Sequence, residues 1–229
     1  MQAPHVLTEP AILYFGTPVV LISTLNEDGS ANIAPMSSAF WLGWRCMLGL
    51  DAGAKTPQNL MRTGECVLNL PSADGVEAVN RLARLTGVNP VPERKVRRGY
   101  TYEKRKFEVS GLTPVPSLTV KPPRALECPI QMEAVLVAHH DLMADDAASR
   151  GAVLIFEVRI QRVHVHPDVL MDEHSNRIDP DKWRPLIMSF QRFYGLGPEL
   201  HESTLAQIPE SAYRGPDIDR ARTTEDKGA

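Results

Sequence analysis

The chain has 229 residues, of which 43% are hydrophobic and 23% are charged, and this ordinary globular composition excludes a chain that is disordered throughout. Its 25 basic and 28 acidic residues give a net charge of −3, which excludes the strong positive field of a typical nucleic-acid-binding protein. The longest apolar runs, such as 19–22 and 152–156, are far shorter than the roughly 20 residues of a membrane helix. We therefore expect no nucleic-acid partner and no membrane partner.

The cysteines and the N-terminal residues bear on the compartment in which the protein works. Cys46, Cys66 and Cys128 are odd in number and form no C-x-x-C motif, so we expect buried thiols in a reducing environment. Residues 1–10 contain neither a basic segment nor a long apolar segment, and therefore do not resemble a secretory signal. These features predict a cytoplasmic location.

The first part of the chain predicts three strands. Residues 18–25 are apolar and rich in β-branched side chains, which is typical of a buried strand. Asp28-Gly29 follows and predicts a hairpin, with the return strand at 30–34. Pro35 is expected to end that strand, because proline donates no hydrogen bond to a sheet. The apolar stretch 40–50 predicts a third strand.

The next segment predicts two helices with a strand between them. Thr56 is a good N-cap, Pro57 suits the first helical position and Gly64 suits the end, so we expect a short helix here. Residues 65–70 predict a fourth strand. Apolar residues spaced by three and four over 74–85 predict the second helix.

The second half predicts a loop, two long strands and a tail. The polar stretch 88–106 carries a basic cluster, and it is either a solvated loop or a loop that folds over a phosphorylated ligand. Residues 128–141 and 151–166 predict long strands, and the second alternates apolar and polar positions. Residues 179–197 are expected to be mostly irregular. We expect one domain over 1–208, followed by a polar and loose C-terminal tail over 209–229.

This order of elements lacks the strand–helix–strand alternation of a parallel sheet. It predicts a mainly β fold, an antiparallel barrel with a few inserted short helices. Nucleotide-binding glycine motifs are absent as well, since the sequence contains neither a P-loop nor a Rossmann fingerprint.

Lys55, Thr56 and Asn59 form one candidate site, at the start of the first predicted helix. A helix N-terminus offers unpaired N–H groups and a partial positive charge, and Lys55 adds a full charge. The Thr56 hydroxyl and the Asn59 amide add donors. Together these groups suit a terminal phosphate. The alternative is an ordinary capped helix with a solvated lysine.

The segment Asn32–Ser38 is a second candidate site. It contains small polar side chains and a proline, and follows a hairpin strand. Such a segment can present backbone amides and hydroxyls to a flat heterocycle or to a ribityl chain. Neighbouring antiparallel strands would bring it within one ligand length of Lys55. The alternative is a simple turn between strands.

The histidines and the basic run carry weaker signals. His164 and His166 share one face of a strand and His139-His140 lies on its partner, but a zinc site needs three or four convergent ligands. We therefore expect no metal. Tyr100 and Tyr102 interleave with the basic run of 94–106, yet glutamates dilute its charge, and we expect no single-stranded nucleic acid there.

Several segments in order resemble one known family. The sequence resembles the flavin reductase-like family, whose fold is an FMN-binding split barrel, as in flavoredoxin-like proteins. The matching segments are Thr17–Thr24, Asp28-Gly29, Asn32–Ser38 with Phe40, Lys55–Leu60, Gly64–Asn69, Gly111–Thr113, Pro122–Arg124, Glu127–Pro129, Val163–His166, Arg177–Asp179 and Tyr194–Gly197. The likeness runs over about residues 11–200.

The resemblance implies an antiparallel split β-barrel that forms a homodimer, with flavin near the subunit interface. It also implies a role for each candidate site residue. The residues expected to line the isoalloxazine and ribityl portion are Asn32, Ala34, Pro35, Ser37 and Ser38. The residues expected to hold the phosphate are Lys55, Thr56 and Asn59. No catalytic side chain is assigned, because flavin itself supplies the chemistry.

The implied activity is that of an NAD(P)H:flavin oxidoreductase. FMN is the expected cofactor, with FAD or riboflavin as alternatives, and NADH or NADPH is the expected hydride donor. An electron-accepting oxygenase or another redox partner would then use the electrons. Two alternatives stay open: a flavin-binding electron carrier without turnover of its own, and a split-barrel protein that binds another ligand.

Overall fold

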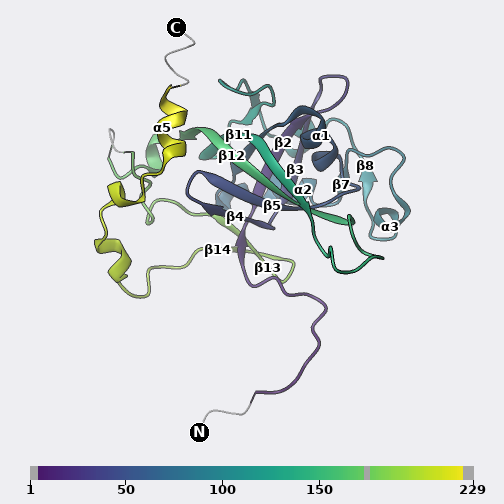
Figure 1. The fold of residues 1–229 in the computed structure, drawn as a ribbon, viewed down its shortest axis with the longest axis horizontal. Helices are drawn as coiled ribbons and strands as arrows, with labels where there is room; N and C mark the ends of the chain where they lie inside the picture. The colour runs from purple at the N-terminus through teal and green to yellow at the C-terminus, as the bar shows by residue number, and fades with distance from the viewer. Residues whose placement is uncertain (1–4, 173–175, 224–229) are drawn as a thin grey trace.

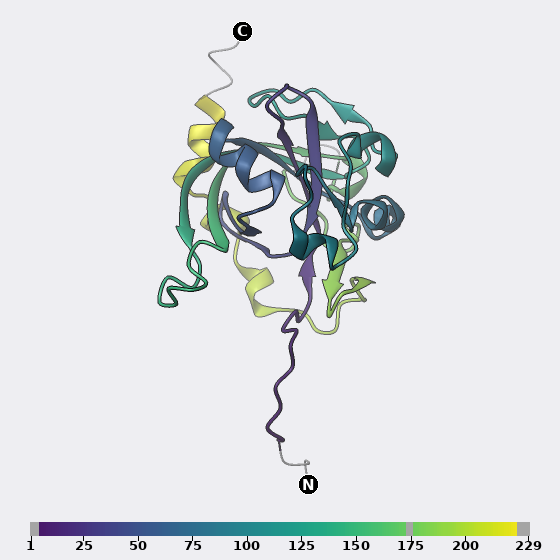
Figure 2. The ribbon, with the colours of Figure 1, turned by 90° about the vertical axis from the view of Figure 1, so that its right-hand side faces the viewer.

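The computed structural model describes residues 5–172 and 176–223, and its largest element is an antiparallel sheet of seven strands (Figure 1). The strand order is β3-β2-β6-β11-β12-β5-β4. The bounds are β2 Val20–Leu25, β3 Ala31–Met36, β4 Ala39–Leu42, β5 Arg45–Asp51, β6 Glu65–Leu70, β11 Ile130–Asp141 and β12 Val153–Val165. The sheet curls into a split barrel, with β3 and β4 at its two edges (Figure 2). The predicted fold class is confirmed.

The hairpin β2–β3 forms where Asp28-Gly29 predicts it, and Gly29 has a φ of 79°. The predicted end of the return strand is wrong, since β3 continues through Pro35 and pairs it with Leu21. Strand β3 lies at the edge of the sheet, so a residue without an N–H costs no bond to a second neighbour.

The apolar stretch 40–50 forms two strands where one was predicted. Strands β4 and β5 pair antiparallel, with Leu42 opposite Arg45. Gly43 between them has a φ of 58°, which permits a tight reversal of the chain. An unbroken apolar run conceals this turn, because both strands contribute side chains to the core.

Helix α1 spans Lys55–Thr63, and Gly64 ends it with a φ of 72° and an N–H bond to the Leu60 carbonyl at 2.8 Å. The predicted cap is wrong, because the helix begins two residues earlier, at Lys55, and Ala54 is its N-cap. The second predicted helix is shorter than expected: α2 covers Val76–Leu82, after a 3-10 turn at Ala73–Gly75.

The stretch 88–106 is more ordered than a solvated loop. It contains α3 (Glu93–Val96) and ends at α4 (Lys106–Ser110), while β7 (Leu85–Thr86) pairs in parallel with β8 (Thr101–Tyr102). Its basic side chains hold it against the barrel, since Arg94 contacts Asp51 and Lys104 contacts Asp28 in the hairpin turn. The loop therefore packs beside the start of α1.

Two predictions for the last part of the chain are wrong. Strands β13 (Leu186–Ser189) and β14 (Arg192–Gly195) form a hairpin within the stretch predicted to be irregular, and β13 also pairs with β1 (Thr17–Pro18). Phe190 and Gln191 both have positive φ, and this turn carries no glycine to reveal it. The remaining pair of short strands is β9 (Pro114–Val115) with β10 (Arg124–Ala125).

The predicted loose tail contains helix α5 (Pro216–Thr223), which packs against β12 (Figure 1). Asp217 accepts a hydrogen bond from Arg45 at 2.9 Å, and Ala221 is buried. The contacts of this helix to the barrel are ionic as well as apolar, so a polar sequence does not exclude its packing there. The predicted tail's residues 224–229 lie outside the described residues.

Two apolar cores flank the β2–β3 hairpin. One fills the barrel and includes Phe156, Val158 and Ile160, which confirms the predicted alternation of β12. The other lies between the outer face of β2–β3 and the helices α2 and α4. The second core therefore positions the loop and helix residues that lie beside β3. Within the described residues, no helix is both long enough and apolar enough to cross a membrane.

Candidate functional site

Three of the predicted site residues meet at the junction of β2, β3 and α1. The Asn32 side chain donates to Thr24 Oγ1 at 3.2 Å and to Thr56 Oγ1 at 3.3 Å. The Asn59 side chain donates to the same Thr24 oxygen at 3.1 Å and to Asn26 Oδ1 at 3.0 Å. Asn32, Thr56 and Asn59 are all buried. This network holds the first turn of α1 beside strand β3.

The N-terminus of α1 has no side-chain cap. Its N-cap, Ala54, makes no capping bond, so Thr56 keeps its hydroxyl for the network with Asn32. The first N–H groups of a helix have no partner within the helix. The N-terminus of α1 therefore offers backbone donors and the positive end of the helix dipole to an anion.

Lys106 brings a buried cation to this junction. Its side chain is only 3% exposed, and Nζ donates to Asn32 Oδ1 at 2.9 Å. Burial, with the neighbouring charge of Lys95, lowers the pKa of Lys106 to about 8, and the charge of Glu103 opposes this shift only in part. The residue begins α4, whose buried Phe107 fixes the side chain's position.

Lys95 on α3 is a second buried cation near the first. It is 9% exposed, and its ammonium lies 5.8 Å from the centre of the Tyr100 ring. Burial is the main cause of its lowered pKa. Within residues 5–172 and 176–223, neither Lys95 nor Lys106 has a carboxylate ion-pair partner. Buried charges are normally paired, so this pair of ammonium groups favours an anionic ligand.

Lys55 lies at the rim of the same junction. Its Nζ is 3.3 Å from Glu27, an exposed carboxylate on the hairpin turn. Gly87 packs closely against the aliphatic part of the Lys55 side chain. A Cβ at Gly87 would lie 3.1 Å from Lys55 Cβ and 3.0 Å from Asn32 Oδ1. Any side chain at Gly87 would therefore push into the space between Lys55 and Asn32.

The other predicted residues continue along β3 away from this junction. Because β3 is an edge strand, alternate residues of Ala31–Met36 point their backbone N–H and C=O groups out of the sheet, except that Pro35 has no N–H. Ser38 is held in place, because Tyr14 shares a hydrogen bond with its hydroxyl at 2.9 Å and Gly49 donates to its carbonyl. Ser37 and Pro35 line a cavity beyond the strand. Ala34 is half-buried between the two ends.

Sequence patterns identified the basic run but not its two buried members. Lys95 and Lys106 stand among other basic residues of similar context, and no spacing separates the inward side chains from the solvated ones. The one local signal is the short apolar pattern after Lys106, which predicts a helix turned toward a core. The packing of α3 and α4 on the barrel decides which lysines are buried.

One histidine of the two long strands, His164, has a buried structural partner. His164 Nε2 lies 2.8 Å from the buried carboxylate of Glu133, which also accepts from the backbone N–H of Leu118 at 2.8 Å and of Thr119 at 2.6 Å. Glu133 therefore fixes the proline-rich segment 114–123, which contains four prolines, against the barrel. Over the described part of the chain, no group of three or more His, Cys, Asp or Glu side chains is placed to hold a metal ion.

A comparison with known protein families covers most of the chain. A model of the flavin reductase like domain matches residues 12–197. The chain belongs to the flavin reductase-like family. The match covers the whole barrel, the loop of α3 and α4, and the β13–β14 hairpin. It ends before α5, so α5 lies outside the matched region.

Several individual proteins are similar to this chain over most of their length. Protein YdfE of Bacillus subtilis (strain 168) is 43% identical over 192 residues, which is 84% of this chain and 89% of YdfE. Flavoredoxin of Desulfovibrio vulgaris (Miyazaki F) has a similar structure, with a TM-score of 0.69 and 23% identity, covering 90% of this chain and 100% of flavoredoxin. Nitrilotriacetate monooxygenase component B from Bacillus cereus also has a similar structure, with a TM-score of 0.67 and 21% identity, covering 82% of this chain and 88% of component B.

Proposed function

We propose that the protein is an FMN-dependent oxidoreductase that transfers hydride from NADH or NADPH to flavin. The observation that carries the proposal is the pair of buried ammonium groups of Lys95 and Lys106, neither of which makes an ion pair with a carboxylate among the described residues. Lys106 lies beside Asn32 on β3, which in turn contacts Thr56 in the first turn of α1. Membership of the flavin reductase-like family supports it independently.

The donor set fits the phosphate of FMN. A phosphate monoester is close to a dianion at neutral pH and has three acceptor oxygens. Lys95 and Lys106 would supply charge from the loop, and Lys55 would supply it from the rim. Thr56 and the N–H groups of α1 would supply hydrogen bonds. This charge match favours FMN over riboflavin, which has no phosphate.

The exposed edge of β3 fits the ring portion. The pyrimidine edge of an isoalloxazine carries alternating donors and acceptors, and an edge strand presents the same alternation in its backbone. Ala34, Pro35, Ser37 and Ser38 would line the ring, while Asn32 would lie between the ring and the phosphate. When bound, flavin supplies the hydride chemistry, and the chain's task is to orient the ring and exclude water.

Two similar proteins support electron delivery as the purpose of the reaction. One is named as a flavoredoxin and another as the component B of a monooxygenase. We therefore propose that reduced flavin, bound or released, serves a redox partner or an oxygenase in the cytoplasm. The second candidate function is a flavin-binding electron carrier without its own turnover, which the flavoredoxin likeness favours.

Oxidation of NADH and NADPH separates these two functions. Purified protein is mixed with a small amount of FMN and with either NADH or NADPH in excess. The absorbance of the reduced nucleotide is then followed over time. Protein-dependent consumption that saturates with nucleotide is the result expected for a reductase. If the protein binds FMN yet consumes neither nucleotide, the reductase proposal is wrong and the electron carrier stands.

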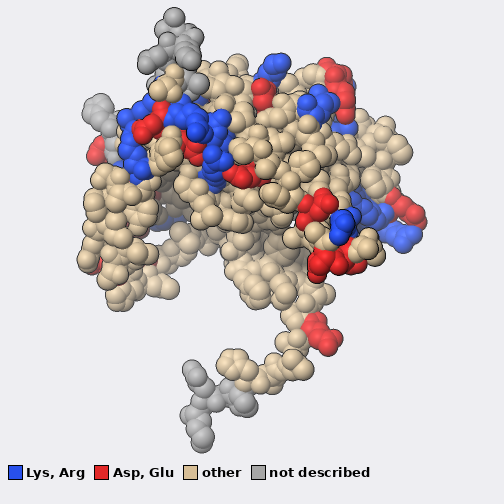
Figure 3. Space-filling view, viewed as in Figure 1, with Lys and Arg blue, Asp and Glu red and all other residues tan. Residues whose placement is uncertain are grey.

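We also propose a homodimer, on the basis of the N-terminal arm. Residues 5–13 run out from the body, and the arm is anchored at Tyr14, whose carbonyl accepts from Phe190 at 2.9 Å (Figures 1 and 2). Leu7 is 100% and Leu13 is 64% exposed. Figure 3 shows few charged side chains on the arm and on the face over β4 and β14. A second copy of the chain would cover these apolar side chains.

A further inference from the structure

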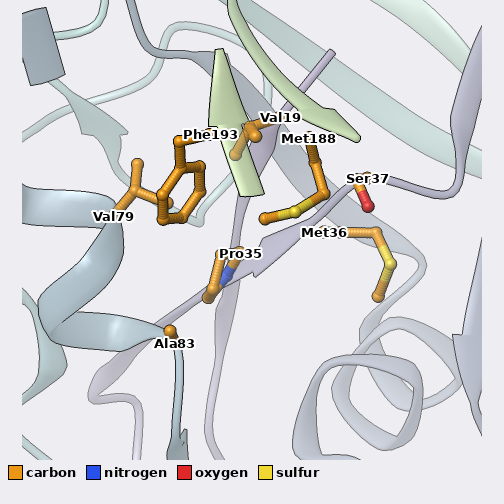
Figure 4. A pocket seen from close by; sticks show the side chains of 8 residues that line it. All are labelled: Val19, Pro35, Met36, Ser37, Val79, Ala83, Met188 and Phe193. Atoms are coloured by element: carbon orange, nitrogen blue, oxygen red, sulfur yellow. The ribbon is translucent and has the colours of Figure 1, made fainter. Parts of the chain in front are cut away.

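A cavity of about 170 Å³ lies beyond the ring end of the site, between α2 and the β13–β14 hairpin (Figure 4). Its walls come from four parts of the fold: the start of β2, the end of β3, α2 and the hairpin. The lining residues are Val19, Pro35, Met36, Ser37, Val79, Ala83, Met188 and Phe193. Figure 4 shows the Phe193 ring and the Met188 side chain reaching toward Pro35.

The lining selects for a neutral ligand. Every side chain around the cavity is uncharged, and the hydroxyl of Ser37 is the one polar side-chain group among the lining residues. Burying a charged group against such walls carries a large desolvation cost. The thioethers of Met36 and Met188 and the ring of Phe193 favour contact with an aromatic face.

The volume selects for one ring. An apolar protein cavity of about 150 Å³ is known to hold benzene, so a cavity of about 170 Å³ accommodates a single substituted ring. The three fused rings of an isoalloxazine exceed it. Its pyrimidine edge also requires several hydrogen-bond partners, and the side chains of these walls offer one hydroxyl. The flavin ring therefore belongs on the edge of β3, and the cavity lies next to it.

We propose that this cavity binds one ring of a neutral aromatic compound, which is a substrate of the site in addition to NADH or NADPH. The proposal rests on the proposed flavin site for its position, because Pro35 and Ser37 belong to both the expected ring contacts and the cavity wall. Ser37 would hydrogen-bond a polar substituent on the ring. Met188 and Phe193 on the hairpin would set the size of the ring that is accepted.

Binding of nitrobenzene to the FMN-loaded protein, followed by ligand-observed NMR and calorimetry, tests the proposal. Nitrobenzene is neutral and has one ring, and benzoate is the matched anionic control. We expect nitrobenzene to bind at least tenfold more tightly than benzoate. Equal binding of both compounds, or binding of neither, would overturn the proposal.

Two variants locate the binding site. Ala83→Leu adds side-chain volume at the cavity wall, and we expect it to weaken nitrobenzene binding at least tenfold while FMN affinity stays within twofold. Phe193→Ala enlarges the cavity, and we expect it to admit naphthalene, which the natural protein excludes. If Ala83→Leu weakens FMN as much as nitrobenzene, the cavity holds the flavin ring and the proposal is wrong. If the natural protein binds nitrobenzene but not FMN, the proposed function fails and the cavity remains a neutral-ring site.

Discussion

At the scale of single residues, Lys106 is the side chain whose position is hardest to explain without a ligand. Its ammonium is almost fully buried and is hydrogen-bonded to the neutral amide oxygen of Asn32. The fall of its pKa from 10.5 to about 8 corresponds to a cost of about 3 kcal/mol for keeping it charged at neutral pH. A bound phosphate would offset that cost.

Lys106→Met therefore has opposite effects on stability and binding. Without ligand, we expect the free energy of unfolding to rise by up to about 2 kcal/mol, because removal of the buried charge outweighs the lost hydrogen bond to Asn32 Oδ1. We expect FMN affinity to fall roughly 10- to 100-fold, the value of a charge-assisted hydrogen bond, and riboflavin affinity to change little. Thermal unfolding and flavin fluorescence titration measure the two effects.

Lys104→Met is the matched control for this variant. Lys104 stands two residues away, is half-exposed and pairs with Asp28 outside the junction. It should leave FMN affinity unchanged. A loss of riboflavin affinity equal to the loss of FMN affinity in Lys106→Met would show that the residue acts on folding and not on the phosphate.

The same lysine predicts how FMN affinity depends on pH. Phosphate favours the protonated ammonium, so above a pKa of about 8 binding must take up a proton. FMN affinity should be nearly constant from about pH 7 to 8, where phosphate is already a dianion, and then fall by up to about tenfold per pH unit. Titrations from pH 7 to 9.5 measure this, and in Lys106→Met the fall should shrink. An FMN affinity that rises over this range contradicts the assignment.

Sequence alone yields part of this site. Asn32, Thr56 and Asn59 were predicted from hydrogen-bonding chemistry and from the family likeness, and the fold brings them together, although their role in binding stays a prediction. The burial of Lys95 and Lys106 depends on tertiary packing of two short helices. Apart from the short apolar pattern after Lys106, the local sequence does not indicate that packing.

At the scale of elements, the predictions fail where a turn leaves no mark on composition. The β2–β3 hairpin was predicted because Asp28-Gly29 marks its turn. The β13–β14 hairpin was missed because Phe190 and Gln191 occupy positions with positive φ that usually carry Gly or Asn. Helix α5 was missed because it is a polar segment that packs on β12 and forms an ion pair between Asp217 and Arg45 of β5.

Glu133 fixes the proline-rich segment 114–123, which precedes β11, against the barrel. Its side chain is completely buried and accepts from Leu118, Thr119 and His164. Burial opposes its ionisation, but these donors outweigh burial and lower the pKa of Glu133 to about 2. Its stabilising effect is therefore complete above the unfolded value of 4.5 and is lost as pH falls toward 2.

Glu133→Gln tests this role. We expect the free energy of unfolding at pH 7 to fall by about 2–4 kcal/mol, since an amide replaces a carboxylate that accepts several bonds. The difference from the natural protein should narrow between pH 4.5 and pH 3. Denaturant unfolding of both proteins at pH 7 and at pH 3 measures both effects. An equal loss of stability at pH 7 and pH 3 would mean that the carboxylate charge is not the cause.

At the scale of the whole molecule, the proposed dimer depends on the exposed arm. Leu7→Ser with Leu13→Ser removes two of its apolar side chains, and we expect the dimer to dissociate at least tenfold more readily because that buried area is lost. Leu118→Ser, at an exposed apolar residue away from the arm, is the control. Light scattering across a dilution series measures the change. A monomeric natural protein at micromolar concentration would overturn the dimer itself.

The central claim is that the junction of α1, β3 and the buried lysines binds the phosphate of FMN. The most direct measurement is the visible absorption spectrum of the purified protein as FMN is added, with riboflavin in a parallel titration. We predict flavin bands that shift on binding and saturate at one FMN per chain, with affinity for FMN at least tenfold above that for riboflavin. An FMN spectrum that stays unchanged in the presence of excess protein, or equal affinity for both flavins, would contradict the account.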